Sequence, residues 1–167
     1  MTSLLMIFAL VVAAVLQAIF PTWLWLGHAH PPVLLGVVLY YALAHSQRHM
    51  MQAAIVAGLL EDALGMIPLG YSSFCFVVAA LVVSKFKDIV FVHETLTHMS
   101  FGALASGAVT MALYGLLSKD DLVALPAGWA VLKTIGSMLL GAVFVPLVFE
   151  IMESLDRTLG NTEVRGT

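Results

Sequence analysis

The sequence has very little charge for its length. Only 10% of its 167 residues are Asp, Glu, Lys or Arg, whereas 61% are hydrophobic, and the mean hydropathy is +1.02. Soluble domains carry about 25% charged residues. The composition therefore excludes an ordinary soluble domain and predicts an integral membrane protein with no folded domain outside the membrane.

Basic charge and cysteine are also scarce. The net charge is −3 and the pI is about 6.0, so no basic surface is available for nucleic acid. Cys75 is the only cysteine, which excludes a disulfide framework and a CxxC metal site. Residues 1–5 contain no Lys or Arg, and no small-x-small cleavage site precedes Phe20. We therefore expect a first membrane span and not a removable signal peptide.

Apolar segments predict a bundle of six transmembrane helices in a single polytopic domain over residues 1–167. The expected spans cover about 4–20, 32–44, 50–64, 71–83, 96–117 and 129–151, and a polar tail covers 153–167. Basic residues gather at the cytoplasmic ends of membrane spans. If the N-terminus is cytoplasmic, the cytoplasmic side holds five basic residues: Arg48, Lys85, Lys87, Arg157 and Arg165. The opposite side holds Lys119, and Lys133 lies just inside the sixth span on that side. This imbalance predicts that both termini are cytoplasmic.

The strongest functional signal is a pair of adjacent carboxylates, Glu61 and Asp62, inside the third apolar segment. If that helix starts at Arg48, Asp62 lies roughly 21 Å along a hydrocarbon slab about 30 Å thick. Charge at that depth is costly and normally faces protein. Gly58 and Gly65 share the Asp62 face and would let a neighbouring helix approach closely. We expect Asp62 to point into the bundle and Glu61 to point about 100° away.

Two interpretations of Asp62 are open. In the first, Asp62 forms an ion pair with Lys133, directly or through water, because both are expected at a similar depth in the outer leaflet. In the second, Asp62 caps the turn over residues 65–68, and Lys133 extends to the outer headgroups. Pro68 and Gly70 are expected to reverse the chain between the third and fourth spans.

Helix spacing predicts two further contacts. Gly102 with Ser106, and Ala103 with Gly107, form small-residue faces on the fifth span that would allow close helix packing. Near the end of the sixth span, Glu153 and Arg157 are four residues apart and should form an ion pair. Both features are structural and point to no chemistry.

No catalytic, cofactor or metal site is expected, so the protein is not predicted to be an enzyme. The run from His93 to His98 resembles a zinc-protease HExxH motif but contains one residue too many. Residues five apart lie about 140° apart around a helix and cannot share a face. No carboxylate accompanies His45 and His49 locally in the sequence, which also has no GxSxG elbow or P-loop.

The assembled residues resemble the MreD family of rod shape-determining membrane proteins. The family signature combines an intramembrane glycine–aspartate pair with a following glycine turn, matched here by Gly58, Asp62, Gly65, Pro68, Leu69 and Gly70. A helix-breaking proline pair, Pro31 and Pro32, precedes the second span as in the family. The chain departs from the pattern at Glu61, where members usually have an apolar residue. The similarity covers about residues 31–83 well and the last span loosely.

The resemblance implies a non-enzymatic scaffold subunit of the bacterial cell-elongation machinery in the inner membrane. Such proteins work with the bitopic partner MreC and, through it, with the peptidoglycan synthase complex that maintains rod shape. The implied fold resembles the substrate-binding S-components of energy-coupling-factor transporters. An alternative function is therefore vitamin binding in an outward-facing cavity. A third, weaker one is a membrane hydrolase, which would need Glu61 and Asp62 beside His93 and His98.

The outer loops favour the scaffold, because they contain few of the convergent polar groups that a vitamin pocket requires. Four residues there could nevertheless line such a pocket: Trp23, Trp25, His28 and His30. The expected topology also places the carboxylates and the His93–His98 segment at opposite membrane faces, which disfavours the hydrolase. We expect membrane lipids to surround the bundle, and no nucleic acid to bind.

Overall fold

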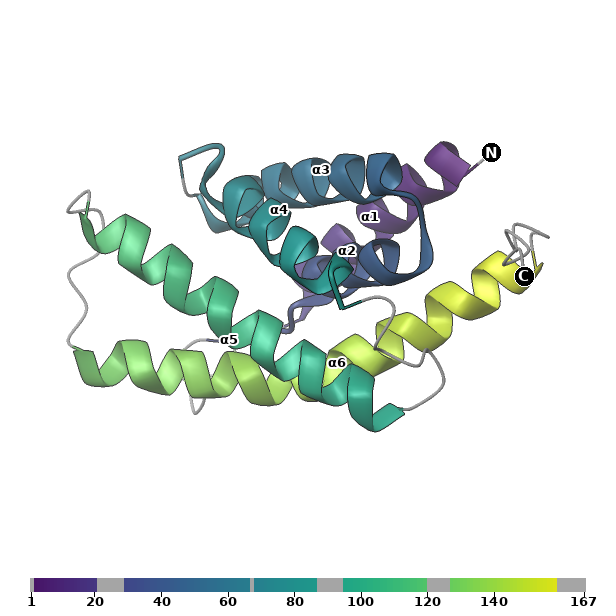
Figure 1. Cartoon of the computed structure of the whole chain (residues 1–167). Helices are drawn as coiled ribbons and strands as arrows, with labels where there is room; N and C mark the ends of the chain where they lie inside the picture. The colour runs from purple at the N-terminus through teal and green to yellow at the C-terminus, as the bar shows by residue number, and fades with distance from the viewer. Residues whose placement is uncertain (1, 21–28, 67, 87–94, 120–126, 159–167) are drawn as a thin grey trace.

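The computed structural model describes residues 2–20, 29–66, 68–86, 95–119 and 127–158. These ranges contain six helices and no strand, so the prediction of an all-α fold is confirmed (Figure 1). The helices are α1 (Thr2–Ile19), α2 (Val33–Ala44), α3 (Gln47–Gly65), α4 (Tyr71–Ser84), α5 (Thr95–Lys119) and α6 (Ala127–Thr158). Each overlaps one expected span, and α6 continues into the segment expected to be a polar tail.

Within the described residues, two helical segments are long and apolar enough to cross a membrane, Thr97–Lys119 and Gly128–Thr158. Three shorter helical segments are also apolar: Leu5–Ile19, Val33–Ala44 and Tyr71–Ser84. The outward faces of α1 and α4 fit lipid surroundings, with Phe8 65% and Phe74 63% exposed. These features fit a membrane protein, while six spans and a likeness to S-components stay predictions.

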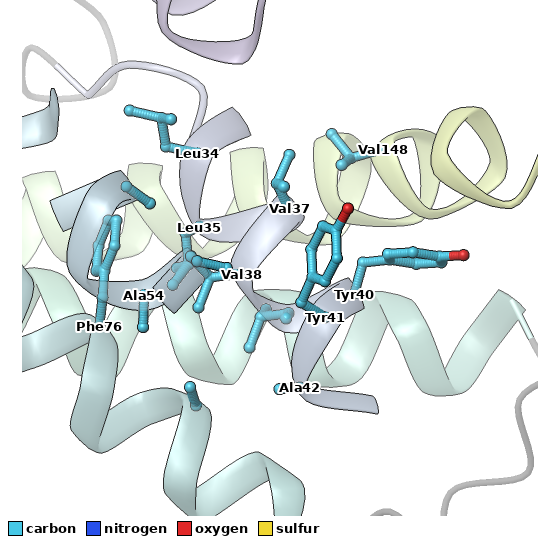
Figure 2. Close-up of a cluster of buried hydrophobic side chains, with 14 of the residues drawn as sticks. Leu34, Leu35, Val37, Val38, Tyr40, Tyr41, Ala42, Ala54, Phe76 and Val148 are labelled. Carbon is cyan, nitrogen blue, oxygen red and sulfur yellow. The ribbon is translucent and has the colours of Figure 1, made fainter. Parts of the chain in front are cut away.

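Helix α2 lies at the centre of the bundle. Every residue from Val33 to Leu43 is buried, and α2 contacts each of the other five helices. A helix that is apolar on all sides has no face suited to water or headgroups and is stable only when surrounded. Figure 2 shows its side chains pointing in several directions, with Phe76 of α4 and Val148 of α6 among their neighbours. The remaining helices pack around this core.

Figure 1 shows α1 to α4 gathered together, with α5 and α6 as a long pair running across them. Small residues permit the tightest contacts. A Cβ on Gly58 of α3 would lie 2.2 Å from Cα of Ser73 on α4. A Cβ on Gly102 of α5 would lie 2.5 Å from the carbonyl oxygen of Gly141 on α6, and one on Gly141 would meet Ser106. The predicted close-packing face at Gly102 and Ser106 is therefore confirmed.

We predict that Gly58→Ala destabilises the protein, although alanine is the better helix former. The added methyl group would overlap the α4 backbone, and such overpacking costs about 1–3 kcal/mol. Gly115→Ala is the matched control, because a Cβ there meets nothing within 4 Å. It should leave stability unchanged or raise it by up to about 1 kcal/mol. Thermal unfolding in detergent measures both, and equal effects would contradict the close α3–α4 contact.

Candidate functional site

The side chain of Asp62 caps the start of α4. Asp62 is fully buried, with 0% exposure. Its Oδ2 accepts a hydrogen bond from Gly70 N–H at 2.7 Å, and its Oδ1 accepts one from Ser72 N–H at 2.9 Å. Gly70, the N-cap position of α4, has no side chain with which to cap the helix. The carboxylate therefore satisfies two backbone donors at the positive end of the α4 dipole.

The main chain of Asp62 closes the end of α3 as well. Met66 N–H donates to the carbonyl oxygen of Asp62, and Met66 adopts a left-handed conformation with φ 51°. Gly70 also has a positive φ, 111°, as expected for a glycine that reverses the chain. Pro68 lies exposed between them. One residue thus fixes both ends of the α3–α4 turn.

The direct ion pair between Asp62 and Lys133 is absent, although the structure describes both residues. No nitrogen–oxygen distance within 4.0 Å joins them. Both carboxylate oxygens of Asp62 already accept backbone hydrogen bonds. The geometry matches the second interpretation, in which Asp62 acts as a cap. The element that it caps is the first turn of α4 and not the turn over residues 65–68. Lys133 is half-buried on α6.

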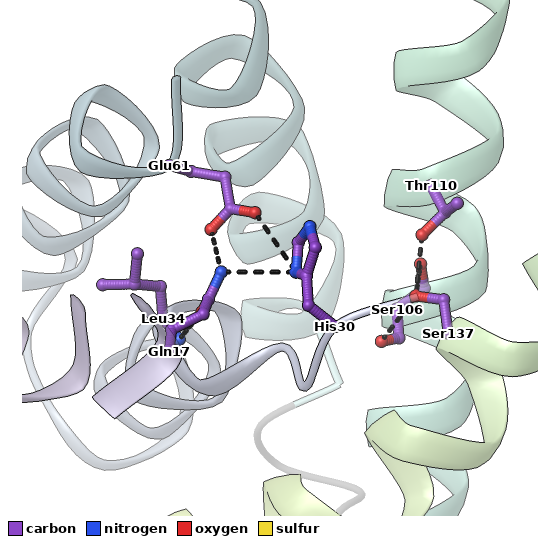
Figure 3. Close-up of polar contacts among 7 residues, drawn as sticks. All are labelled: Gln17, His30, Leu34, Glu61, Ser106, Thr110 and Ser137. Atoms are coloured by element: carbon purple, nitrogen blue, oxygen red, sulfur yellow. Dashed lines mark hydrogen bonds and ion pairs between the residues drawn. The ribbon is translucent and has the colours of Figure 1, made fainter. Parts of the chain in front are cut away.

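Glu61 belongs to a separate polar network (Figure 3). Gln17 of α1 donates from Nε2 to Glu61 Oε2 at 2.7 Å, and its Oε1 accepts from Leu34 N–H at 3.2 Å. His30 Nδ1 lies 3.9 Å from Glu61 Oε1. The network connects α1, the start of α2 and α3. Sequence reasoning missed it, although Gln17 was the one polar residue in the predicted first span.

A cavity of about 180 Å³ lies beside Glu61, between the end of α3, the start of α4 and the α5–α6 pair. Polar side chains on its wall include His30, Glu61, Ser72, Ser106, Thr110 and Lys133. Thr110 donates to Ser137 Oγ at 2.7 Å, and Ser137 donates to the Ser106 carbonyl at 3.4 Å (Figure 3). Gly65, one of the predicted turn residues, also lines the cavity.

Histidine and tyrosine side chains meet at the other end of the bundle. Tyr40 donates to Asp156 Oδ2 at 2.5 Å, and His45 Nε2 lies 3.7 Å from the same oxygen. His98 lies against the ring of Phe149, with centroids 4.4 Å apart. The contacts tie the end of α2 to α6. His98 and Glu61 line different pockets, whereas the hydrolase hypothesis requires His98 beside the carboxylates.

The expected Glu153–Arg157 ion pair is present, at 2.5 Å. Several other residues named from the sequence, Trp23, Trp25, His28, His93 and Glu94, lie outside the described residues. Among the described residues, Gln17 and Glu61 form a polar network near the start of α2, and Tyr40, His45 and Asp156 form another near its end.

Comparison with protein families identifies the chain. A family model described as rod shape-determining protein MreD matches residues 1–155 of the 167. The chain belongs to the MreD family. No curated protein and no solved structure gave a significant match. The resemblance noted in the sequence is thus confirmed, and membership implies a role in rod shape determination. The MreD family is membrane-associated and is not known as enzymatic.

We predict that Asp62→Asn lowers the stability of the purified protein. The amide retains one acceptor oxygen but turns an NH₂ group towards a backbone N–H, and an unsatisfied buried donor costs about 1–3 kcal/mol. Glu150→Gln, the same change at an exposed position on α6, should have no effect. Unfolding in detergent provides the measurement. An Asn variant as stable as wild type would contradict the capping role.

A double-mutant cycle tests whether Asp62 and Lys133 interact. Because no direct contact joins them, the effects of Asp62→Asn and Lys133→Met on unfolding free energy should add to within about 0.5 kcal/mol. A coupling energy above about 1 kcal/mol would restore the ion-pair hypothesis, including its water-linked form.

Proposed function

We propose that this MreD-family protein is a non-enzymatic scaffold subunit of the bacterial cell-elongation machinery. It lies in the inner membrane with six spans and cytoplasmic termini, binds an MreC-like bitopic protein, and acts through that partner on the peptidoglycan synthase complex. The observation that carries the proposal is the family match over residues 1–155. It covers all six helices except the last residues of α6.

The exposed faces of the bundle support a scaffold. Helix α1 contacts α2 and α3, and its opposite side exposes large apolar side chains, such as Val15 at 52% and Ile19 at 72%. In a membrane, such faces contact lipid or a partner helix, and helix association depends on close packing. Close packing requires a surface of fixed shape. The Asp62 cap contributes to that shape by holding α3 against α4.

One observation favours the alternative function, a small-molecule-binding subunit of an energy-coupling-factor transporter. The cavity beside Glu61 contains convergent polar groups, as a ligand pocket does. Its volume, about 180 Å³, is nevertheless below the roughly 300–1,000 Å³ typical of pockets for drug-sized ligands. The cavity is therefore small for a vitamin, and the scaffold is the better-supported function.

Complementation in a rod-shaped bacterium depleted of its own MreD-family protein tests the proposal. The wild-type chain, expressed with an MreC-like protein, should restore rods and should retain that protein through mild detergent purification. Asp62→Leu should lose both properties, because the hydrocarbon side chain leaves the Gly70 and Ser72 donors unsatisfied in a buried site. Glu150→Gln should retain both.

Two results would contradict the scaffold. The first is restoration of rods with no MreC-like protein retained by the wild-type chain. The second is co-purification with transporter ATPase subunits in its place, which would establish the alternative. Protein level in the membrane must be matched between variants, so that a loss of shape reflects lost assembly and not lost protein.

A further inference from the structure

A serine on the cavity wall carries an unpartnered hydroxyl group. Ser72 is 0% exposed, its Oγ has no hydrogen-bond partner, and the residue lines the cavity. Its N–H is bound to Asp62, so the side chain alone is unsatisfied. Buried polar groups in folded proteins nearly always have a partner. The hydroxyl is therefore positioned to bind a polar group inside the cavity.

Two opposite charges also line the cavity without pairing. Glu61, with 14% of its side chain exposed, lies on the α3 side, and the half-buried Lys133 lies on α6. No nitrogen–oxygen distance within 4.0 Å joins the two charges, although both residues line the same cavity. Poorly solvated charges are stabilised by direct partners. Glu61 accepts a hydrogen bond from Gln17 and lies 3.9 Å from His30 Nδ1. A group with a cation at one end and an anion at the other would add a charged partner for Glu61 and supply one for Lys133.

We propose that this cavity binds a small zwitterionic group, with a primary ammonium at Glu61 and a phosphate or carboxylate at Lys133. Ionised Glu61 is an acceptor and Lys133 a donor, which fixes the orientation of the ligand. Ser72 and Thr110, which carry hydroxyl groups, also line this cavity. The apolar side chains of Phe76 and Leu113 complete the wall and favour a compact ligand.

The ammonium must carry N–H groups. A carboxylate gains charge-assisted hydrogen bonds from a primary ammonium, whereas a quaternary ammonium has no proton to donate. Two sources present this chemistry, the headgroup of an ethanolamine phospholipid and a free zwitterion. The site follows from the cavity residues alone and stands whether or not the protein acts as a scaffold.

Binding to the delipidated full-length protein in detergent, followed by microscale thermophoresis, distinguishes these sources. The probes are dihexanoyl phosphatidylethanolamine and phosphoethanolamine, each compared with its choline counterpart. We expect an ethanolamine compound to bind about tenfold or more tightly than its choline counterpart, since only it can donate hydrogen bonds to Glu61. If the lipid binds more tightly than phosphoethanolamine, the natural ligand is a lipid headgroup. If phosphoethanolamine binds as tightly as the lipid or more tightly, the natural ligand is a free zwitterion.

Three variants locate the site. Glu61→Gln should abolish the preference for ethanolamine, Lys133→Met should weaken binding of both headgroups about tenfold, and Ser72→Ala should weaken it severalfold. The controls are Glu150→Gln and Lys119→Met, the same charge changes at residues that do not line this cavity. Because Glu61 also binds Gln17, unfolding is measured for each variant. If Glu61→Gln fails to fold, Lys133→Met and Ser72→Ala still decide the question.

Equal affinity for ethanolamine and choline compounds in the wild-type protein would overturn the proposal. Binding that Lys133→Met and Ser72→Ala leave unchanged would also overturn it, because the lipid would then be held by the detergent-covered surface. Neither result bears on co-purification with the MreC-like protein, so failure of this site and failure of the scaffold are distinguishable.

Discussion

The hydrogen bonds of one buried carboxylate determine how the chain turns within the bundle. A chain reversal in an apolar setting exposes backbone N–H and C=O groups that water cannot reach, and each must find a partner in the protein. Asp62 supplies three acceptors: its carbonyl for Met66, and its two carboxylate oxygens for Gly70 and Ser72. The partial positive charge at the start of α4 favours the carboxylate, so no basic side chain is needed as a direct partner.

The rest of the bundle depends on this turn. It holds α3 beside α4 at a separation that only a glycine at position 58 permits. The α3–α4 pair covers part of α2, and α6 covers another part, where a Cβ on Gly36 would lie 3.2 Å from Val148. Contacts at both ends of α2 fix its position, through Gln17 at its start and Asp156 near its end. The result is a closely packed core with apolar outer faces, which fits a membrane protein.

The sequence predicted the helices well because their apolar runs are long and their breaks contain glycine, proline or charge. It also predicted the burial of Asp62, which follows from the cost of charge in hydrocarbon. The sequence left two interpretations of Asp62 open, an ion pair and a cap, and the structure matches the cap. The donors themselves, Gly70 N–H and Ser72 N–H, were not predicted, because almost every residue carries a main-chain N–H. Met66 was missed since a left-handed non-glycine residue is uncommon. The Gln17–Glu61 bond joins residues 44 positions apart, a separation that no local pattern reveals.

Amide hydrogen exchange at Gly70 and Ser72, measured by NMR on the detergent-solubilised protein, tests the central claim most directly. The account predicts that both amides are strongly protected in the wild-type protein. It also predicts that Asp62→Ala accelerates exchange at these two positions more than at amides in the middle of α2. Rapid exchange of both amides in the wild type, or protection that is unchanged in the alanine variant, would show that the Asp62 carboxylate does not hold the start of α4.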